Sequence, residues 1–271
     1  MIRGKTMTII KNKSLDKDFY RKHWYADIYE KQENQIDDVE YILSTIGNSP
    51  KRILEVACGG GRILEPLAKA GHSVTGFDMD EYMLEKCRAR IKGMRNANCY
   101  MADAIKQDWG TGYEVVVMGG NFLLNIISNM DYEKAQQLFI KKAASSLMPN
   151  GRLFLACMCE ANFPSSQDPN EYTIFKGKDD LDTVGEFIMF DQHNDGKTRM
   201  HRSKRRIKIV TKEGKEKIIE WDVIKHFPSL VQINDWLKES GFIIENEAGD
   251  FIGSCITDET KCAIIWAKKI L

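Results

Sequence analysis

One short run of residues combines an acid with a cluster of glycines. Residues 52–62 read Arg-Ile-Leu-Glu-Val-Ala-Cys-Gly-Gly-Gly-Arg. Its apolar part predicts a short buried strand, and three glycines follow at once. Glycines at the end of a strand let bare backbone N–H groups approach a ligand. Glu55 lies inside this strand, where a carboxylate is costly to bury unless it has a partner. The run therefore indicates a ligand-binding loop with an acid beside it.

Three further polar residues follow later predicted strands. Asp78 comes after a strand at 73–77, and Asp103 after a strand at 97–101. Asn121 comes after two glycines that end a third strand. Ligands of an open parallel sheet bind outside the carboxyl ends of its strands, so we expect these side chains at one edge. An acid roughly 20 residues beyond a glycine loop is placed to accept both hydroxyls of a ribose. The pattern predicts a nucleoside-binding site.

Alternating elements must position these residues. Apolar strand candidates alternate with amphipathic helix candidates, which argues for a parallel sheet covered on both faces. The strands are expected at 52–57, 73–77, 97–101, 113–118 and 151–157, and the helices at 62–70, 80–92 and 131–147. Two last strands, near 242–244 and 262–267, are expected to pair as an edge hairpin. The predicted fold class is α/β, with a Rossmann-like, seven-stranded, mostly parallel sheet.

The pattern changes after the fifth strand. Residues 185–227 have strand character, with turn signals at Asn194-Asp195-Gly196 and at 212–215. They predict an antiparallel β meander inserted after the fifth strand. The expected domains are an N-terminal helical lid at 1–48, a core at 49–162 and 228–271, and an inserted substrate-lid region at 163–227.

Composition excludes several classes of protein. Lysine plus arginine equals aspartate plus glutamate, 39 each among 271 residues, so the global basic charge of many nucleic-acid binders is absent. The seven cysteines are odd in number and scattered, which favours reduced thiols. We find no signal-peptide pattern and no apolar run near the ~20 residues of a membrane span. A cytoplasmic protein is expected, and no metal site is predicted.

At this point the chain resembles the class I S-adenosylmethionine-dependent methyltransferases. Residues 55–61 are similar to that family's first motif, an acid followed by G-x-G-x-G, and they depart from it at Ala57, where glycine is usual. The resemblance implies that Gly59 and Gly61 lie against the methionine part of the cofactor. It also implies that Glu55 orients the loop or reaches the cofactor's ammonium through water. The likeness covers roughly residues 50–160.

The same resemblance assigns roles at the nucleoside end. Asp78 corresponds to the ribose ligand and Met79 to the residue that packs on adenine. Asp103 and Ala104 match the position that recognises the adenine amino group. Asn121 is expected beside the bound cofactor. For Asp78 the alternative is a helix N-cap, and for Asp103 it is a simple turn residue.

An N-terminal segment also resembles a family feature. Residues 25–29, Tyr-Ala-Asp-Ile-Tyr, are similar to a Tyr-Asp-x-x-Tyr-like helix that covers the cofactor in small-molecule methyltransferases. By that likeness Tyr25 bonds the methionine carboxylate, and Arg62 balances its charge. The alternative for these aromatic residues is plain core packing.

The methyl acceptor is predicted from what surrounds the strand ends. Acids there can hold an ammonium and take its proton, and the candidates are Glu160 and Asp131. Asp131 also suits a helix N-cap, and Glu160 a solvated loop. His201 and His226 are interpreted as structural or exposed. The order of elements is similar to amino-sugar N,N-dimethyltransferases and to enzymes that methylate the amine of modified peptides. A small molecule or short peptide is therefore the expected partner.

Two other functions remain open. Basic residues over 197–208 suit contact with RNA phosphates, although acids at 213–220 suit pairing with them instead. An acid after the second strand also suits a nicotinamide-dependent oxidoreductase, but the loop lacks the G-x-G-x-x-G spacing that seats a pyrophosphate. The oligomeric state is left open.

Overall fold

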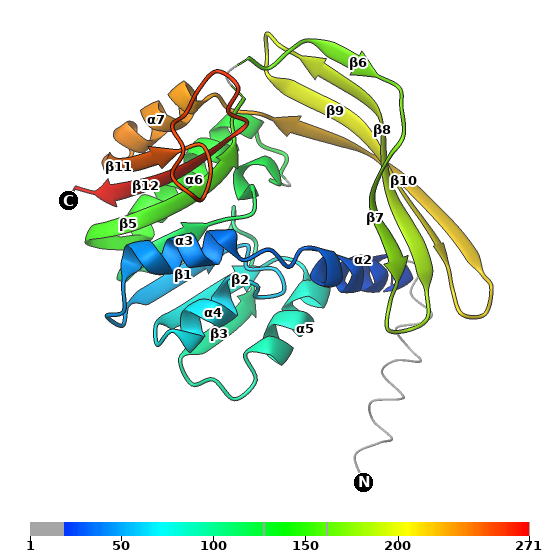
Figure 1. Cartoon of the computed structure of the whole chain (residues 1–271), viewed down its shortest axis with the longest axis horizontal. Helices are drawn as coiled ribbons and strands as arrows, with labels where there is room; N and C mark the ends of the chain where they lie inside the picture. Colours follow the sequence, from blue (N-terminus) through cyan, green and yellow to red (C-terminus); the bar gives the residue numbers. More distant parts are fainter. Residues whose placement is uncertain (1–18, 127, 161, 271) are drawn as a thin grey trace. The chain divides into compact units, whose positions relative to one another are not determined.

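The computed structural model describes residues 19–126, 128–160 and 162–270 (Figure 1). The chain divides into two compact units, which are described separately. The core unit comprises residues 35–165, 194–201 and 225–271. The antiparallel unit comprises residues 1–34, 166–193 and 202–224.

The core unit is built on one seven-stranded sheet (Figure 1). Its strand order is β11-β12-β5-β4-β1-β2-β3. The bounds are β1 Arg52–Val56, β2 Ser73–Asp78, β3 Ala97–Met101, β4 Tyr113–Met118, β5 Leu147–Met158, β11 Phe242–Ala248 and β12 Cys262–Lys269. β1 to β5 run parallel, whereas β12 runs antiparallel to both β5 and β11. The predicted α/β class and mostly parallel sheet are confirmed.

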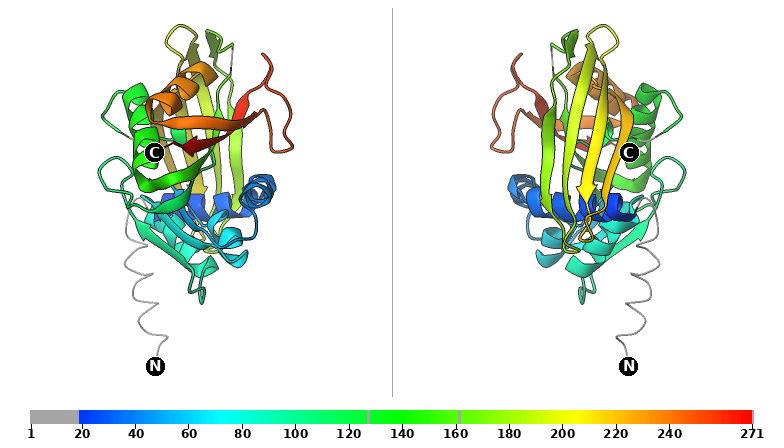
Figure 2. Two further views of the ribbon diagram at one scale, coloured as in Figure 1. Left: turned by 90° about the vertical axis from the view of Figure 1, so that its left-hand side faces the viewer. Right: turned by 90° about the vertical axis from the view of Figure 1, so that its right-hand side faces the viewer.

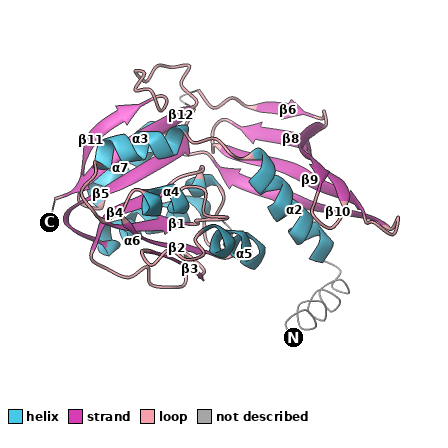
Figure 3. Ribbon diagram, turned by 60° about the horizontal axis from the view of Figure 1, so that its bottom comes forward, coloured by secondary structure: helices cyan, strands magenta, loops and turns pink. Residues whose placement is uncertain are grey.

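Helices cover both faces of this sheet (Figure 3). Their bounds are α3 Asp37–Ile46, α4 Leu64–Lys69, α5 Glu81–Arg90, α6 Tyr132–Ser146 and α7 Leu230–Glu239, with a 3₁₀ turn, η1, at Phe122–Leu124. Alternate strand residues point to opposite faces, so Leu54 packs with the α6 and α7 side and Ile53 with the α3, α4 and α5 side. α7 lies beside β11 (Figure 2).

The antiparallel unit contains one helix and most of a second sheet, and the ends of β8, β9 and β10 within 194–201 and 225–226 belong to the core unit. α2 spans Phe19–Gln32, and the strands are β6 Ser166–Asp168, β7 Tyr172–Lys178, β8 Val184–Asp195, β9 Met200–Val210 and β10 Glu216–His226. The order is β10-β9-β8-β6, with β7 also paired to β8. The predicted hairpin turns near 194–196 and 212–215 join β8 to β9 and β9 to β10. β6 and β7 lie before residue 185, where the predicted meander begins, and were not predicted. The residues of β7 are mostly exposed and show no clean apolar alternation.

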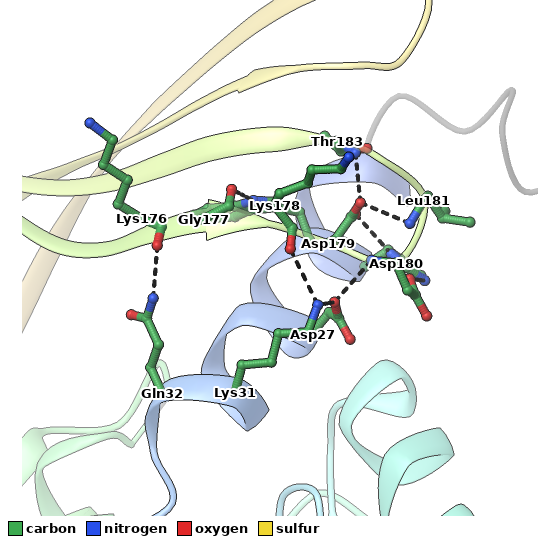
Figure 4. Close-up of polar contacts among 12 residues, drawn as sticks. Asp27, Lys31, Gln32, Lys176, Gly177, Lys178, Asp179, Asp180, Leu181 and Thr183 are labelled. Atoms are coloured by element: carbon green, nitrogen blue, oxygen red, sulfur yellow. Dashed lines mark hydrogen bonds and ion pairs between the residues drawn. The ribbon is translucent and has the colours of Figure 1, made fainter.

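α2 is bound to the β7–β8 turn by polar contacts (Figure 4). Asp27 accepts from Lys31 Nζ at 2.5 Å and from the Asp180 backbone N–H at 3.0 Å. Gln32 Nε2 donates to the Lys176 carbonyl at 2.7 Å, and Trp24 Nε1 to the Gly177 carbonyl at 3.0 Å. The acid of the predicted Tyr-Ala-Asp-Ile-Tyr segment therefore serves to fix the turn.

The units divide the chain differently from the domains expected from sequence. Residues 35–48, which include α3, group with the core, and so do residues 194–201. The role of the N-terminal region as a lid stays a prediction, and the part of it before residue 19 lies outside the described residues. Among the described residues, no helix has the length and apolarity needed to cross a bilayer. The seven cysteines are free thiols, as expected.

Candidate functional site

The glycine run forms a tight turn between β1 and α4. Cys58 N–H donates to the Phe77 carbonyl at 3.0 Å, and Gly61 N–H donates to the Cys58 carbonyl at 2.8 Å. Gly59 and Gly61 both have positive φ, +51° and +82°. A Cβ on Gly61 would lie 2.8 Å from Cys87 Sγ, so both conformation and space require glycine there.

Ala57 adopts the same left-handed conformation, with φ of 55°. Alanine pays a steric cost in that region and glycine does not. The resembled family usually has glycine at this position, and the backbone shows why. Alanine in place of the usual glycine at position 57 therefore puts a small conformational strain on the loop.

Asp78 fastens the loop to the end of β2. Its Oδ2 accepts from the Gly59 N–H at 3.0 Å, and its Oδ1 accepts from the Asp80 N–H at 2.8 Å. Asp80, in turn, caps α5 by accepting from the Tyr82 N–H. The N-cap role considered for Asp78 thus belongs to Asp80. Burial raises the pKa of the Asp78 carboxyl, and its backbone hydrogen bonds oppose that shift.

Glu55 is the least satisfied polar side chain of the loop region. The residue is 4% exposed, and its Oε2 is buried with no hydrogen-bond partner in the part of the chain that the structure describes. Burial raises the pKa of this carboxyl well above its usual range. The nearby Cys87 raises it further and Arg62 lowers it, while the carboxyls of Asp38 and Asp78 add smaller upward shifts. A cationic group brought to this oxygen would relieve both costs.

Negative charge exceeds positive charge around Glu55. Arg62 donates from both terminal nitrogens to the Asp38 carboxylate, at 2.7 and 2.6 Å. That pairing leaves two more carboxyls, Glu55 and Asp78, acting on the same site. Because burial raises the pKa of Glu55 and Asp78, an approaching cation would favour the ionised form of both carboxyls.

Comparisons with known proteins agree with this geometry. Residues 53–151 match the family model described as "Methyltransferase domain". These residues are a methyltransferase domain. They contain the glycine loop, Asp78, Asp103 and Asn121. The predicted resemblance to class I S-adenosylmethionine-dependent methyltransferases is confirmed.

Individual relatives are similar over different extents. Ubiquinone biosynthesis O-methyltransferase from Coxiella burnetii is 26% identical over 121 residues, which cover 44% of this chain. The chain spans about half the length of that relative, 48%. A methyltransferase structure from Clostridium acetobutylicum is similar with a TM-score of 0.71 and 13% identity, over 90% of this chain and 97% of that one.

A third similar structure includes the antiparallel region. It is an amino pentose methyltransferase from Micromonospora echinaspora, involved in calicheamicin biosynthesis. The TM-score is 0.60 at 16% identity, over 97% of this chain and 96% of that one. At such identities the likeness shows the fold. The fold of the whole chain, beyond the methyltransferase domain, is thus shared with known enzymes.

Asp103 and Ala104, the residues predicted to recognise adenine, already make local hydrogen bonds. Asp103 Oδ1 accepts from the Ile105 N–H at 2.9 Å, and Lys106 Nζ lies 2.8 Å from Oδ2. This hydrogen-bonded ion pair lowers the pKa of Asp103. The carbonyl of Ala104 accepts from Trp109 Nε1 and Lys142 Nζ. The turn role considered for Asp103 is therefore present, and its contact with adenine stays a prediction.

Two other predicted residues stand at strand ends. Met79 follows β2 and is 53% exposed, so its side chain is available to a planar ligand. Asn121 follows β4 with φ of 57°, and its Oδ1 accepts from the Met158 N–H at 2.8 Å. That bond ties the loop after β4 to the end of β5. Contacts of both residues with the cofactor stay predictions.

Tyr25 lies in the antiparallel unit. Its ring packs edge-on against Phe187 and Phe175, with centroids 5.6 and 6.0 Å apart, and it lies 6.0 Å from Tyr29. Core packing, the alternative considered from sequence, is observed. Contact of Tyr25 with the cofactor carboxylate stays a prediction. Arg62, its expected companion, is held by Asp38.

The two acids proposed for catalysis differ in their bonds. Asp131 caps α6, because its Oδ1 accepts from the Lys134 N–H at 3.0 Å. Glu160 follows β5 and is partly buried, and its backbone carbonyl accepts from Arg199. The helix-cap alternative for Asp131 is therefore observed. A catalytic role for either acid stays a prediction.

The sequence analysis interpreted His226 as structural or exposed, and it did not name Gln136, the residue that His226 contacts. His226 and Gln136 are 5% and 1% exposed and lie next to the loop after β4. A lone histidine and a helix glutamine carry no spacing signal. The tertiary structure alone joins them.

Proposed function

We propose that this protein is an S-adenosylmethionine-dependent methyltransferase that acts on an amine nitrogen of a small molecule or short peptide. One observation carries the cofactor part: Glu55 Oε2 is buried beside the glycine loop and the carboxyls of Asp38 and Asp78, without a hydrogen-bond partner among the described residues. S-adenosylmethionine carries an ammonium and a sulfonium, so it is a cation of the kind that this site attracts. The residues present fit the cofactor.

The chain's own groups divide the binding between them. Glu55 holds the ammonium, Asp78 accepts from the ribose hydroxyls, and the loop at 59–61 lies against the methionine chain. Asp78 has this capacity because each carboxylate oxygen accepts more than the single bond it now has. When bound, the cofactor supplies an electrophilic methyl group. The protein orients the acceptor toward that group and excludes water.

Support for an amine acceptor comes from the fold and the charge. The amino pentose methyltransferase shares nearly the whole chain's fold, including the region inserted after β5. Acids near the strand ends, such as Glu160 and Asp131, favour a cationic acceptor such as an ammonium. The charged strand β9 does not favour RNA, because several of its basic side chains have acidic partners. Arg206 pairs with Glu171 and Glu220, and Lys208 pairs with Glu216.

A second candidate is O-methylation. The curated relatives over the core are named as ubiquinone biosynthesis O-methyltransferases. That likeness covers 39–44% of this chain, so it bears on the cofactor more than on the acceptor.

Two experiments test the proposal. Calorimetry with S-adenosylhomocysteine is expected to give one site per chain, and titration with NAD and NADP to give none. Radiolabelled S-adenosylmethionine is then offered with matched acceptors: glucosamine and a free-amine tripeptide, their N-acetyl derivatives, catechol, and total RNA. Label on the free amines alone supports the proposal. Label on catechol alone would replace nitrogen with oxygen, and heat from the nicotinamide nucleotides alone would refute the cofactor assignment.

A further inference from the structure

A buried glutamine fixes the orientation of His226. Gln136 Nε2 donates to two backbone carbonyls, those of Leu123 at 2.9 Å and His226 at 3.0 Å. Only the amide nitrogen can donate, so these two acceptors determine which end of the amide faces them. The other end, Oε1, therefore faces His226 Nδ1 at 2.7 Å.

This arrangement selects one tautomer of the imidazole. The amide oxygen can only accept, so Nδ1 must carry the proton. In the neutral ring, Nε2 then holds a free lone pair. No group in the described residues bonds Nε2, and that atom keeps some surface accessible to solvent although the residue is buried. The described part of the fold therefore does not use this lone pair.

Hydrogen bonds link His226 and its neighbours to the loops that follow β4 and β5. Gln136 ties it to Leu123 in η1, directly after β4. Next to it, the Phe227 N–H donates to the Arg199 carbonyl, and Arg199 also contacts the carbonyl of Glu160, after β5. β1, β4 and β5 are parallel, so these loops and the glycine loop emerge at one edge of the core sheet.

We propose that His226 Nε2 is the general base of the reaction, and that Gln136 is the positioning residue that keeps it unprotonated. The inference rests on the proposed function. As the acceptor nitrogen forms its bond to the methyl carbon, the electron pair of the carbon–sulfur bond leaves with sulfur. The proton released by that nitrogen moves to Nε2 and from there to solvent. A neutral imidazole suits this step, and an imidazolium would block it.

The electrostatics keep the ring neutral near pH 7. Burial lowers the pKa of His226, and Arg199 lowers it further, whereas Glu133 and Asp131 act in the opposite direction. Because the pKa is lowered below the usual 6.5, the lone pair persists to more acidic pH than in a free histidine.

The first test needs no acceptor. In ¹⁵N-imidazole NMR spectra, His226 is expected to show a protonated Nδ1, an unprotonated Nε2 and a pKa below that of a free histidine. Gln136→Met removes the oxygen that selects the tautomer, so the signal of protonated Nε2 should grow. A wild-type His226 with its proton on Nε2 would overturn the inference.

The second test uses His226→Asn, whose side-chain amide can still donate to Gln136 Oε1. It should keep the unfolding midpoint and the affinity for S-adenosylhomocysteine. Its turnover of whichever probe amine is labelled should fall about 10²-fold or more, with KM changed little, and lose the acidic limb of the pH profile. His201→Asn is the matched control, since His201 Nδ1 also lies 2.7 Å from an amide oxygen, that of Asn194. It should retain wild-type turnover.

The outcomes separate the two proposals. If wild type fails to bind S-adenosylhomocysteine, the proposed function and the base are both overturned. If it binds and methylates, but His226→Asn turns over within threefold of wild type with the same pH profile, only the base is overturned.

Discussion

Two buried acids at strand ends have opposite surroundings. Asp179, after β7, has hydrogen-bond partners for both carboxylate oxygens within the antiparallel unit. Its Oδ1 accepts from the N–H groups of Leu181 and Thr183, and its Oδ2 lies 3.1 Å from His23 Nδ1. Glu55, near the end of β1, has a buried carboxylate oxygen with no hydrogen-bond partner among the described residues. The hydrogen bonds of Asp179 stabilise a turn, whereas the unbonded oxygen of Glu55 can accept a hydrogen bond from a ligand. The difference separates architecture from binding at residues of the same chemical type.

The largest effect is expected where the loop has no space. Gly61→Ala combines φ of +82° with a Cβ 2.8 Å from Cys87 Sγ, so it should destabilise the protein by about 2–4 kcal/mol and weaken S-adenosylhomocysteine binding. Gly214→Ala is the control, since φ is +78° there but nothing lies within 4 Å of the new Cβ. It should cost about 1–2 kcal/mol and leave binding unchanged. Denaturant unfolding and calorimetry measure both, and equal losses in the two variants would contradict the argument.

The second prediction sets the two acids against each other. Glu55→Gln should reduce S-adenosylhomocysteine affinity by about 10–100-fold, because a charge-assisted bond is worth roughly 1.5–3 kcal/mol. Asp179→Asn should leave that affinity unchanged but destabilise the protein by about 1–3 kcal/mol, because an amide meets its backbone and histidine partners less well. Calorimetry and urea unfolding give the two readouts. A binding loss in Asp179→Asn would break the comparison.

The pH dependence of stability sharpens that prediction. The folded-state pKa of Glu55 is raised, so in the ligand-free protein its contribution is fully present below the ordinary glutamate value and is lost as pH rises through the folded pKa. Glu55→Gln removes that loss. The variant should therefore exceed wild type in stability at high pH while binding the ligand more weakly. Unfolding midpoints that fall with pH equally in both proteins would argue against it.

The smallest effect concerns Ala57. Glycine adopts φ of 55° without the steric cost that alanine pays, so Ala57→Gly should stabilise the protein by up to about 1 kcal/mol. Ala68→Gly, within α4, should instead destabilise it by about 1 kcal/mol or more. Thermal unfolding of the two variants is the measurement. A destabilised Ala57→Gly would show that the loop does not hold this strain.

Local patterns predicted much of the core. Apolar runs and their glycine and aspartate boundaries placed β1 to β5 and the helices between them, because each is defined by neighbouring residues. The antiparallel strands were found only in part. β7 pairs with β8, the next strand along the chain, but its own residues are mostly exposed and give no apolar alternation by which to recognise it.

The candidate site divides in the same way. The sequence by itself determined the glycine loop, Glu55 and Asp78, since a fixed spacing after successive parallel strands puts them at one edge. The tertiary structure decided which bonds the neighbouring polar side chains make. Arg62 pairs with Asp38, Asp80 caps α5, and Asp27 accepts from the backbone of the β7–β8 turn. It alone joined Gln136 to His226, 90 residues apart. Which polar groups are satisfied by the fold, and which are left for a ligand, depends on contacts between distant segments that no local pattern contains.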